Sequence, residues 1–455
     1  MKKTNIISLL MLLSVFLSAL HAETTSAEEQ KTKINTGIKV YWSFGQIVNT
    51  SFLRDYDHED EDWLDGKAFG YIGTSLIARA RIREKLQIYT EFLAAVNYGP
   101  DEGNRDVPMK RTQFATMRYT YARLALRQTL SDARSFLTIG YFPFNYAPET
   151  QDIGAYLFKT GTYPGFIISG SGEWRLTGFH LQTKIPEMLQ HNLFFTAEMD
   201  YPPIYDMSLT YLAKLEKEHF NASAGVMLDR VIQARARKTS PKEGSGPTKL
   251  ATSAYYDTRG NAVLDENGDT TWYTKAGVKL MLRGCFDFKK FISSARLGDN
   301  DLKLYAEAAL LGVKSYPGYY DKISERIPAM LGLNLPTFKV LDLLAVEAEY
   351  YKSPWRNNPN NTDLAPTPYN SFEFNTETQT FRMLSPDLGA GEKGKDDNIK
   401  WAVTAKKSIS RFMIEARVAS DHFRYVSADG SVPSGDERLH GPDEWYWQLI
   451  LTAGL

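Results

Sequence analysis

Cysteine is nearly absent from this sequence: Cys285 is the single cysteine among 455 residues. An internal disulfide is therefore excluded, and the fold must be held by backbone hydrogen bonds and packing. An excess of one charge is also missing, because 53 basic residues face 54 acidic ones. A chain this close to neutrality is not a general nucleic-acid binder, so we expect no nucleic acid among its partners.

Catalytic and cofactor motifs are missing too. The chain has no GxSxG, no HExxH, no phosphate-binding glycine loop and no CxxC. We therefore predict no enzyme, no cofactor and no metal site, with an outer-membrane hydrolase of scattered residues as the alternative. His180, His191, His219 and His422 are interpreted as structural. The acidic run 55–65 is interpreted as a solvated loop, with cation binding as the other reading.

Long apolar runs are scarce, and the mean hydropathy of −0.36 is not that of a helical membrane protein. The only long run, Ile6–Leu20, follows Met1-Lys2-Lys3 and precedes Ala22. This order of a charged region, an apolar region and a small residue predicts a cleaved signal peptide, residues 1–22, and export from a bacterium. A membrane anchor is disfavoured by the short length. A polar leader, 23–33, follows, and we assign 34–455 to one domain.

What the chain does have is strict alternation of apolar and polar residues, best developed in the hairpin Phe69–Tyr98. Alternation over this length predicts strands with one apolar and one polar face. The arms match the roughly 9–11 residues that a tilted strand needs to cross a bilayer. One polar face carries Arg79, Arg81 and Arg83, and an arginine facing lipid near the midplane costs about 2–4 kcal/mol. That face must therefore meet water.

We infer a transmembrane antiparallel β-barrel of about sixteen strands, with an uncertainty of two, long extracellular loops and short periplasmic turns. A soluble secreted array of β-sandwiches is the alternative. An even count lets the first and last strands pair, which removes the sheet edge. Sixteen strands enclose an aqueous channel. Arg118 falls on the apolar face of its strand, predicted near 114–129, so we expect it at an interface or beside a β-bulge.

The export signal, the strand count and a long loop after the fifth strand resemble Gram-negative porins. Phe136–Phe144 is similar to the "L-x-x-G-x-F/Y-x-x-P/F" strand of anion- and substrate-selective porins. The resemblance implies that the loop 145–172 folds into the barrel as a constriction, and that the chain is a homotrimer. That constriction would include Glu149, Asp152 and Lys159. Two features depart from the family: Leu455 replaces the usual terminal Phe, and no lysine ladder typical of phosphate-selective members is evident.

The predicted function is a passive diffusion channel for small hydrophilic or charged solutes, placed in outer-membrane lipid. A pore selects through the sign and spacing of its lining charges, although many such charges merely pair with neighbours. The alternatives are an adhesive or structural surface barrel, and a sugar-selective channel whose loop aromatics stack on sugar rings. The predicted pore-lining residues are Arg79, Arg81, Arg83, Glu91, Arg123, Arg127, Lys279, Glu307 and Glu347.

Overall fold

The computed structural model describes residues 32–50, 64–100, 110–160, 167, 174–185, 188–199, 205–232, 253–254, 268, 272–273, 276–292, 295–313, 322–353, 357, 372–375, 380–383, 399–424, 437, 439 and 441–454. The expected signal peptide, most of the leader and most of the acidic run lie outside these residues. Within them nearly all the regular secondary structure is β-strand, with two short 3-10 helices, Phe288–Phe291 (η3) and Ile323–Arg326 (η4). No helix in this part is long and apolar enough to cross a membrane.

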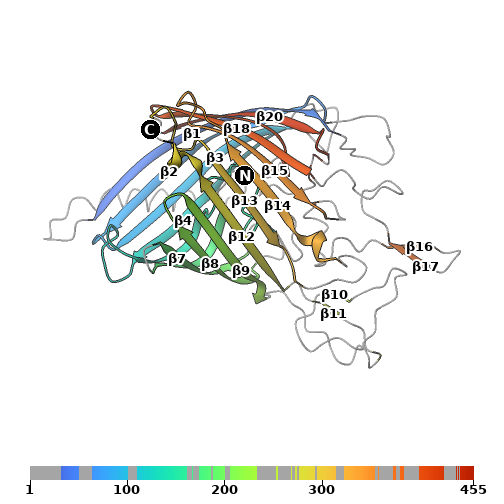
Figure 1. Cartoon of the computed structure of the whole chain (residues 1–455), viewed down its shortest axis with the longest axis horizontal. Coiled ribbons are helices and arrows are strands. Elements are labelled where there is room, and N and C mark those ends of the chain that lie inside the picture. Colours follow the sequence, from blue (N-terminus) through green and yellow to red (C-terminus); the bar gives the residue numbers. More distant parts are fainter. Residues whose placement is uncertain are drawn as a thin grey trace, which may run out of the picture.

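Sixteen strands close into one barrel, and each pairs antiparallel with its neighbours in the order of the sequence (Figure 1). Two small two-stranded sheets are separate from the barrel sheet: one is formed by β10 (Ser253–Ala254) and β11 (Trp272–Tyr273), the other by β16 (Phe372–Asn375) and β17 (Thr380–Met383). The barrel strands are β1 (Lys33–Asn49), β2 (Ala68–Ile82), β3 (Leu86–Gly99), β4 (Lys110–Ala125), β5 (Ser135–Phe144), β6 (Trp174–Lys184), β7 (Leu189–Ala197), β8 (Met207–Glu216), β9 (Phe220–Ile232), β12 (Gly277–Asp287), β13 (Lys303–Leu310), β14 (Pro328–Asn334), β15 (Leu343–Tyr351), β18 (Ile399–Ile409), β19 (Phe412–Ser420) and β20 (Trp445–Gly454).

The barrel closes where β1 pairs with β20, from Lys39 opposite Gly454 to Asn49 opposite Trp445. Every barrel strand therefore has a neighbour on both sides, and closure removes the unpaired edge that hydrocarbon would not tolerate. The predicted all-β class, the antiparallel barrel and the count of sixteen are confirmed. Because the count is even, β1 starts and β20 ends at the same rim. We call it the terminal rim; it carries the turn between β2 and β3.

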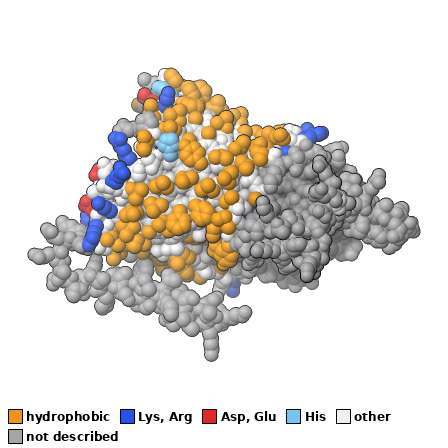
Figure 2. Space-filling view, turned by 90° about the horizontal axis from the view of Figure 1, so that it is seen from below, with side chains coloured by type: hydrophobic (Ala, Val, Ile, Leu, Met, Phe, Trp, Pro, Cys, Tyr) orange, Lys and Arg blue, Asp and Glu red, His pale blue; other side chains and the backbone are white. Residues whose placement is uncertain are grey.

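The outer face of the barrel is apolar. Along β2, Ile72 and Leu76 are about half exposed (51% and 46%), whereas Ser75 and Ile77 between and beside them are buried on the inner face. Figure 2 shows hydrophobic side chains covering the flank of the molecule, with Lys and Arg gathered along one edge. This is the two-faced pattern that the alternation predicts for strands between lipid and a polar interior.

Two strand boundaries differ from the prediction. The fourth strand runs from Lys110 to Ala125, so Arg127 lies in the following turn with a φ of 71°. The strand expected from Trp272 begins at Gly277, because Trp272 belongs to the small β10–β11 sheet. The predicted bulge at Arg118 is confirmed: Glu91 pairs with Tyr119 and Phe92 with Met117, which leaves Arg118 as the extra residue. The bulge turns the Arg118 side chain inward.

Two glycines face each other where β5 pairs with β6, and each has a backbone that only glycine adopts readily. Gly140 has a φ of 127° and Gly178 a φ of 143°. A Cβ on Gly140 would lie 2.4 Å from the backbone oxygen of Thr120. The glycine of the Phe136–Phe144 motif is therefore required by close approach of the neighbouring strand.

Candidate channel interior

The chain that follows β5 crosses the inside of the barrel. Its described part, residues 145–160, contacts lumen-facing side chains of β12, β13, β15 and β19. These strands lie across the barrel from β5 in the ring of sixteen. We call residues 145–160 the inner segment. Its anchors are side chains of the wall, so the barrel itself holds the segment in place.

Glu347 on β15 is the first anchor. Its carboxylate accepts hydrogen bonds from three successive backbone amides of the inner segment: Gln151 N at 2.7 Å, Asp152 N at 2.9 Å and Ile153 N at 3.1 Å. The Tyr305 hydroxyl donates a fourth bond, at 2.9 Å. Glu347 is 1% exposed. A buried carboxylate needs such a set of donors, because an unsatisfied one would be costly.

Glu307 on β13 is the second anchor. It accepts bonds from the Tyr156 amide at 2.8 Å and the Ala155 amide at 3.1 Å. The Tyr146 hydroxyl, 2.7 Å away, and Arg283, at 3.3 Å, complete its surroundings. Two wall glutamates therefore fix both halves of the inner segment through its backbone, whatever side chains the segment carries.

Charged side chains of the inner segment pair with the same wall. Glu149 lies 3.0 Å from Arg283, and Asp152 lies 2.9 Å from Arg417 on β19. Lys159 donates to the backbone oxygen of Asp152 at 2.7 Å. The structure thus places Glu149, Asp152 and Lys159 inside the barrel, and the contacts of the two acids are with β12 and β19. Their partners are not the arginines of β2.

A third anchor lies beyond the end of β19. The His422 imidazole sits 2.7 Å from Glu349 and 3.2 Å from Glu437, and Glu349 also accepts the Tyr156 hydroxyl at 2.7 Å. Burial lowers the pKa of His422, but the two carboxylates outweigh this and raise it to about 10. Burial opposes ionisation of Glu437, but Lys400 and His422 hold its pKa well below its usual value. His422 is structural, as predicted, and it ties this cluster to the inner segment.

Aromatic side chains of the inner segment and of the end of β5 pack against neighbouring residues, which argues against a row of sugar-stacking rings. Phe142, Tyr146, Tyr156 and Phe158 are all at most 5% exposed. Phe158 packs on Phe194 with ring centroids 5.2 Å apart. Stacking on a solute needs an accessible ring face, which these four lack. The sugar-stacking interpretation is therefore wrong for them, and Tyr163 lies outside the described residues.

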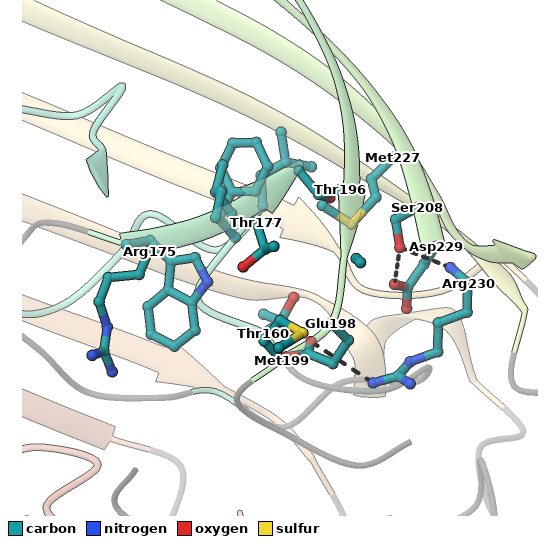
Figure 3. Close-up of a pocket in the computed structure, with 15 residues that line it drawn as sticks. Thr160, Arg175, Thr177, Thr196, Glu198, Met199, Ser208, Met227, Asp229 and Arg230 are labelled. Atoms are coloured by element: carbon teal, nitrogen blue, oxygen red, sulfur yellow. Dashed lines mark hydrogen bonds and ion pairs between the residues drawn. The ribbon is translucent and has the colours of Figure 1, made fainter. Parts of the chain in front are cut away.

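A small polar cavity of about 50 Å³ lies where the inner segment meets β6–β9 (Figure 3). Three of its charged lining residues, Glu198, Asp229 and Arg230, form ion pairs with each other or with neighbours outside the cavity. Arg230 lies 3.2 Å from Asp206 and 3.9 Å from Glu198, and Lys279 lies 3.2 Å from Asp229. The predicted pore residue Lys279 is 1% exposed. The charge of Lys279 is therefore neutralised by the ion pair with Asp229 inside the barrel wall.

The wall formed by β2–β4 is different, because two of its arginines are exposed on the inner face. Arg79 and Arg81 are exposed on the inner face of β2, and Arg79 lies over the Tyr89 ring at 5.2 Å. Glu91 on β3 is buried and satisfied by the Tyr89 hydroxyl at 2.6 Å and Arg118 at 3.2 Å. Arg83 lies in the turn after β2. The accessible charge of this wall is consequently positive.

The pore-lining residues inferred from sequence fall into three groups, with Arg123 apart from them. Arg79 and Arg81 line the accessible interior; Glu91, Lys279, Glu307 and Glu347 are buried in contacts; Arg83 and Arg127 lie in turns. Arg123 stacks on Phe136 with 4.1 Å between its guanidinium carbon and the ring centroid. Sequence reasoning missed Arg417 and the anchoring role of Tyr305. Both residues alternate with outward-facing residues on their strands, and this alternation indicates that their side chains point into the barrel.

No family model and no curated protein matches this chain. Solved structures that resemble it are porins. One is the OmpF of Salmonella typhi in complex with daunomycin, with 9% identity, coverage of 93% of this chain and 98% of that one, and a TM-score of 0.46. Another is a mutant of the Rh. blastica porin, with 6% identity, 93% and 100% coverage and a TM-score of 0.42. The chain forms a porin-like barrel.

Proposed function

We propose that this protein is a passive diffusion channel for small hydrophilic or charged solutes in the outer membrane of a Gram-negative bacterium. The observation that carries the proposal is the pairing of an apolar outer belt with a polar interior that holds a chain segment across it. Glu307 and Glu347 fix that segment against β13 and β15, and Arg79 and Arg81 remain exposed on β2. Solutes would pass between the segment and this basic wall.

The same proposal includes the export of the chain and the orientation of the barrel in the outer membrane. Residues 1–22 act as the signal peptide and 23–33 as a leader, and the barrel occupies 34–455. The terminal rim carries tight turns, such as 83–85, 217–219 and 410–411, so we assign it to the periplasm. The residues 145–172 form the constriction. We further propose a homotrimer, and chemical cross-linking in native membranes would test that assembly.

The testing experiment is single-channel recording in a planar bilayer, with the reversal potential measured under a salt gradient. The accessible charge on β2 is positive, so we expect solute-sized conductance steps and an anion preference. The triple variant R79Q/R81Q/R83Q should reduce that preference. R111Q is the matched control, since Arg111 is exposed on β4 near the opposite rim.

Silence from folded, heat-modifiable protein would refute the channel and favour a surface barrel that binds partners through its loops. Conductance with a cation preference would keep the channel and refute control by the β2 arginines. If net charge rather than position set the preference, R111Q, which removes one charge, would shift the reversal potential by about a third as much as the triple variant, which removes three.

A further inference from the structure

A basic cleft lies at the terminal rim, away from the inner segment and its anchors. It is lined by Arg81, Glu84, Gln87, Arg123, Leu130, Ser131 and Phe136, and its volume is about 280 Å³. Ligand pockets in proteins run from about 300 to 1,000 Å³, so this cleft suits a small molecule. The anchoring of the inner segment does not use this cleft, which shares Arg81 alone with the basic wall of the proposed conduction path.

Strand register builds the cleft. Arg81 on β2 pairs with Gln87 on β3, and Gln87 pairs with Arg123 on β4. These three side chains therefore stand side by side on the inner face, at one level of the barrel. Lys33 on β1 is opposite Arg81 and extends the same row. Arg81 and Arg123, on either side of the neutral Gln87, repel each other. An anion bound between the two guanidinium groups would reduce that repulsion.

The turn between β4 and β5 closes one side. Leu130 N donates to the backbone oxygen of Glu84 at 2.7 Å, and Ala125 N donates to that of Lys85 at 2.8 Å. These bonds fasten the turn to the β2–β3 hairpin and bring Leu130 and Ser131 beside Arg81. The cleft thus has a fixed edge supplied by backbone contacts.

The cations of the cleft keep their charge available. Within the described part of the chain, neither Arg81 nor Arg123 forms an ion pair with a carboxylate. Arg123 donates to the amide oxygen of Gln182 at 3.3 Å, and its guanidinium carbon lies over the Phe136 ring, 4.1 Å from the centroid. Its guanidinium is therefore oriented by two neutral partners without being neutralised. Phe136 and Leu130 add apolar surface next to it.

From this arrangement we propose that the cleft binds a small organic carboxylate with an apolar body. A guanidinium presents parallel N–H donors that match a carboxylate, and Arg81 and Arg123 supply two of them. Gln87 and Ser131 add neutral hydrogen-bonding groups, and Phe136 and Leu130 contact the apolar part. Among the described residues that line the cleft, Glu84 is the one acid, which favours a ligand with a single negative charge over a multiply charged one.

The position of the cleft at a channel mouth rests on the proposed function, but the binding does not. The test is therefore equilibrium binding of benzoate to the purified, folded full-length protein in detergent, measured by isothermal titration calorimetry. We expect one site per chain, at least tenfold weaker binding in R81Q and in R123Q, and binding within twofold of the parent in R111Q. Benzamide, the neutral analogue, should bind at least tenfold more weakly than benzoate.

Equal binding of benzoate and benzamide, or equal losses in R81Q and R111Q, would overturn the proposal. Inorganic phosphate binding as tightly as benzoate would overturn the role of Phe136 and Leu130. Because Arg81 is exposed, we expect R81Q to fold, and this variant still tests the proposal if R123Q does not fold. Binding by a protein that does not conduct would keep the cleft and reject the channel, and conduction without binding would do the reverse.

Discussion

Replacing Glu347 with Gln should loosen the inner segment without disturbing the barrel. The remaining side-chain oxygen can still accept from Gln151 and Tyr305. The new amide nitrogen, however, would face the donors of Asp152 and Ile153, which now contact the other carboxylate oxygen. A hydrogen bond to a charged group contributes about 1.5–3 kcal/mol, so losing two costs about 3–6 kcal/mol. At about 1.4 kcal/mol per factor of ten, local opening should become roughly 10²- to 10⁴-fold more frequent.

Hydrogen–deuterium exchange with mass spectrometry measures that opening directly. In E347Q the peptide covering 145–160 should take up deuterium faster by roughly the same factor, while peptides from β2 and β3 stay unchanged. E84Q, in an exposed turn, is the control and should leave both unchanged. Unaltered uptake over 145–160 would refute the anchoring role of Glu347. Equal acceleration in β2 and β3 would show that the barrel as a whole had been weakened.

Three further predictions follow from the fold. The folded pKa of His422, about 10, exceeds its unfolded value of about 6.5, so its stabilising contribution is complete below pH 6.5 and is lost towards pH 10. The stability difference between parent and H422Q, from urea titrations, should therefore be larger at pH 6 than at pH 10; an equal difference contradicts this. G140A should lower the yield of folded, heat-modifiable barrel, whereas G284A, whose added Cβ would have its nearest neighbour at 3.6 Å, should not. Leu282 is 66% exposed and lies on the outer face of the barrel, so L282R should destabilise the barrel in vesicles by about 2–4 kcal/mol. L282M should be nearly neutral.

The architecture was readable from the sequence because a strand's side chains alternate with a period of two. Along β2 that period separates Leu76 from Ser75, and the cost of an arginine in lipid decides which face turns outward. The bulge at Arg118 was readable for the same reason, since one residue out of phase needs one extra residue in the strand. Strand ends were less readable: the polar turn after Ala125 continues the alternation by chance, which placed Arg127 on a strand.

The interior was not readable to the same degree, because alternation tells which way a side chain points and not what it meets. Glu307, Glu347 and Arg79 all lie on the polar face of an alternating strand. The two glutamates nevertheless bind the inner segment, whereas Arg79 is exposed to the lumen. Each of these glutamates is more than a hundred residues away in sequence from the inner-segment residues that it binds. Barrel closure and the path of the inner segment bring them together. The sequence by itself therefore determined the barrel, through local periodicity and the cost of charge in lipid. Only the tertiary structure decided which charges are paired, because pairing depends on contacts across the lumen.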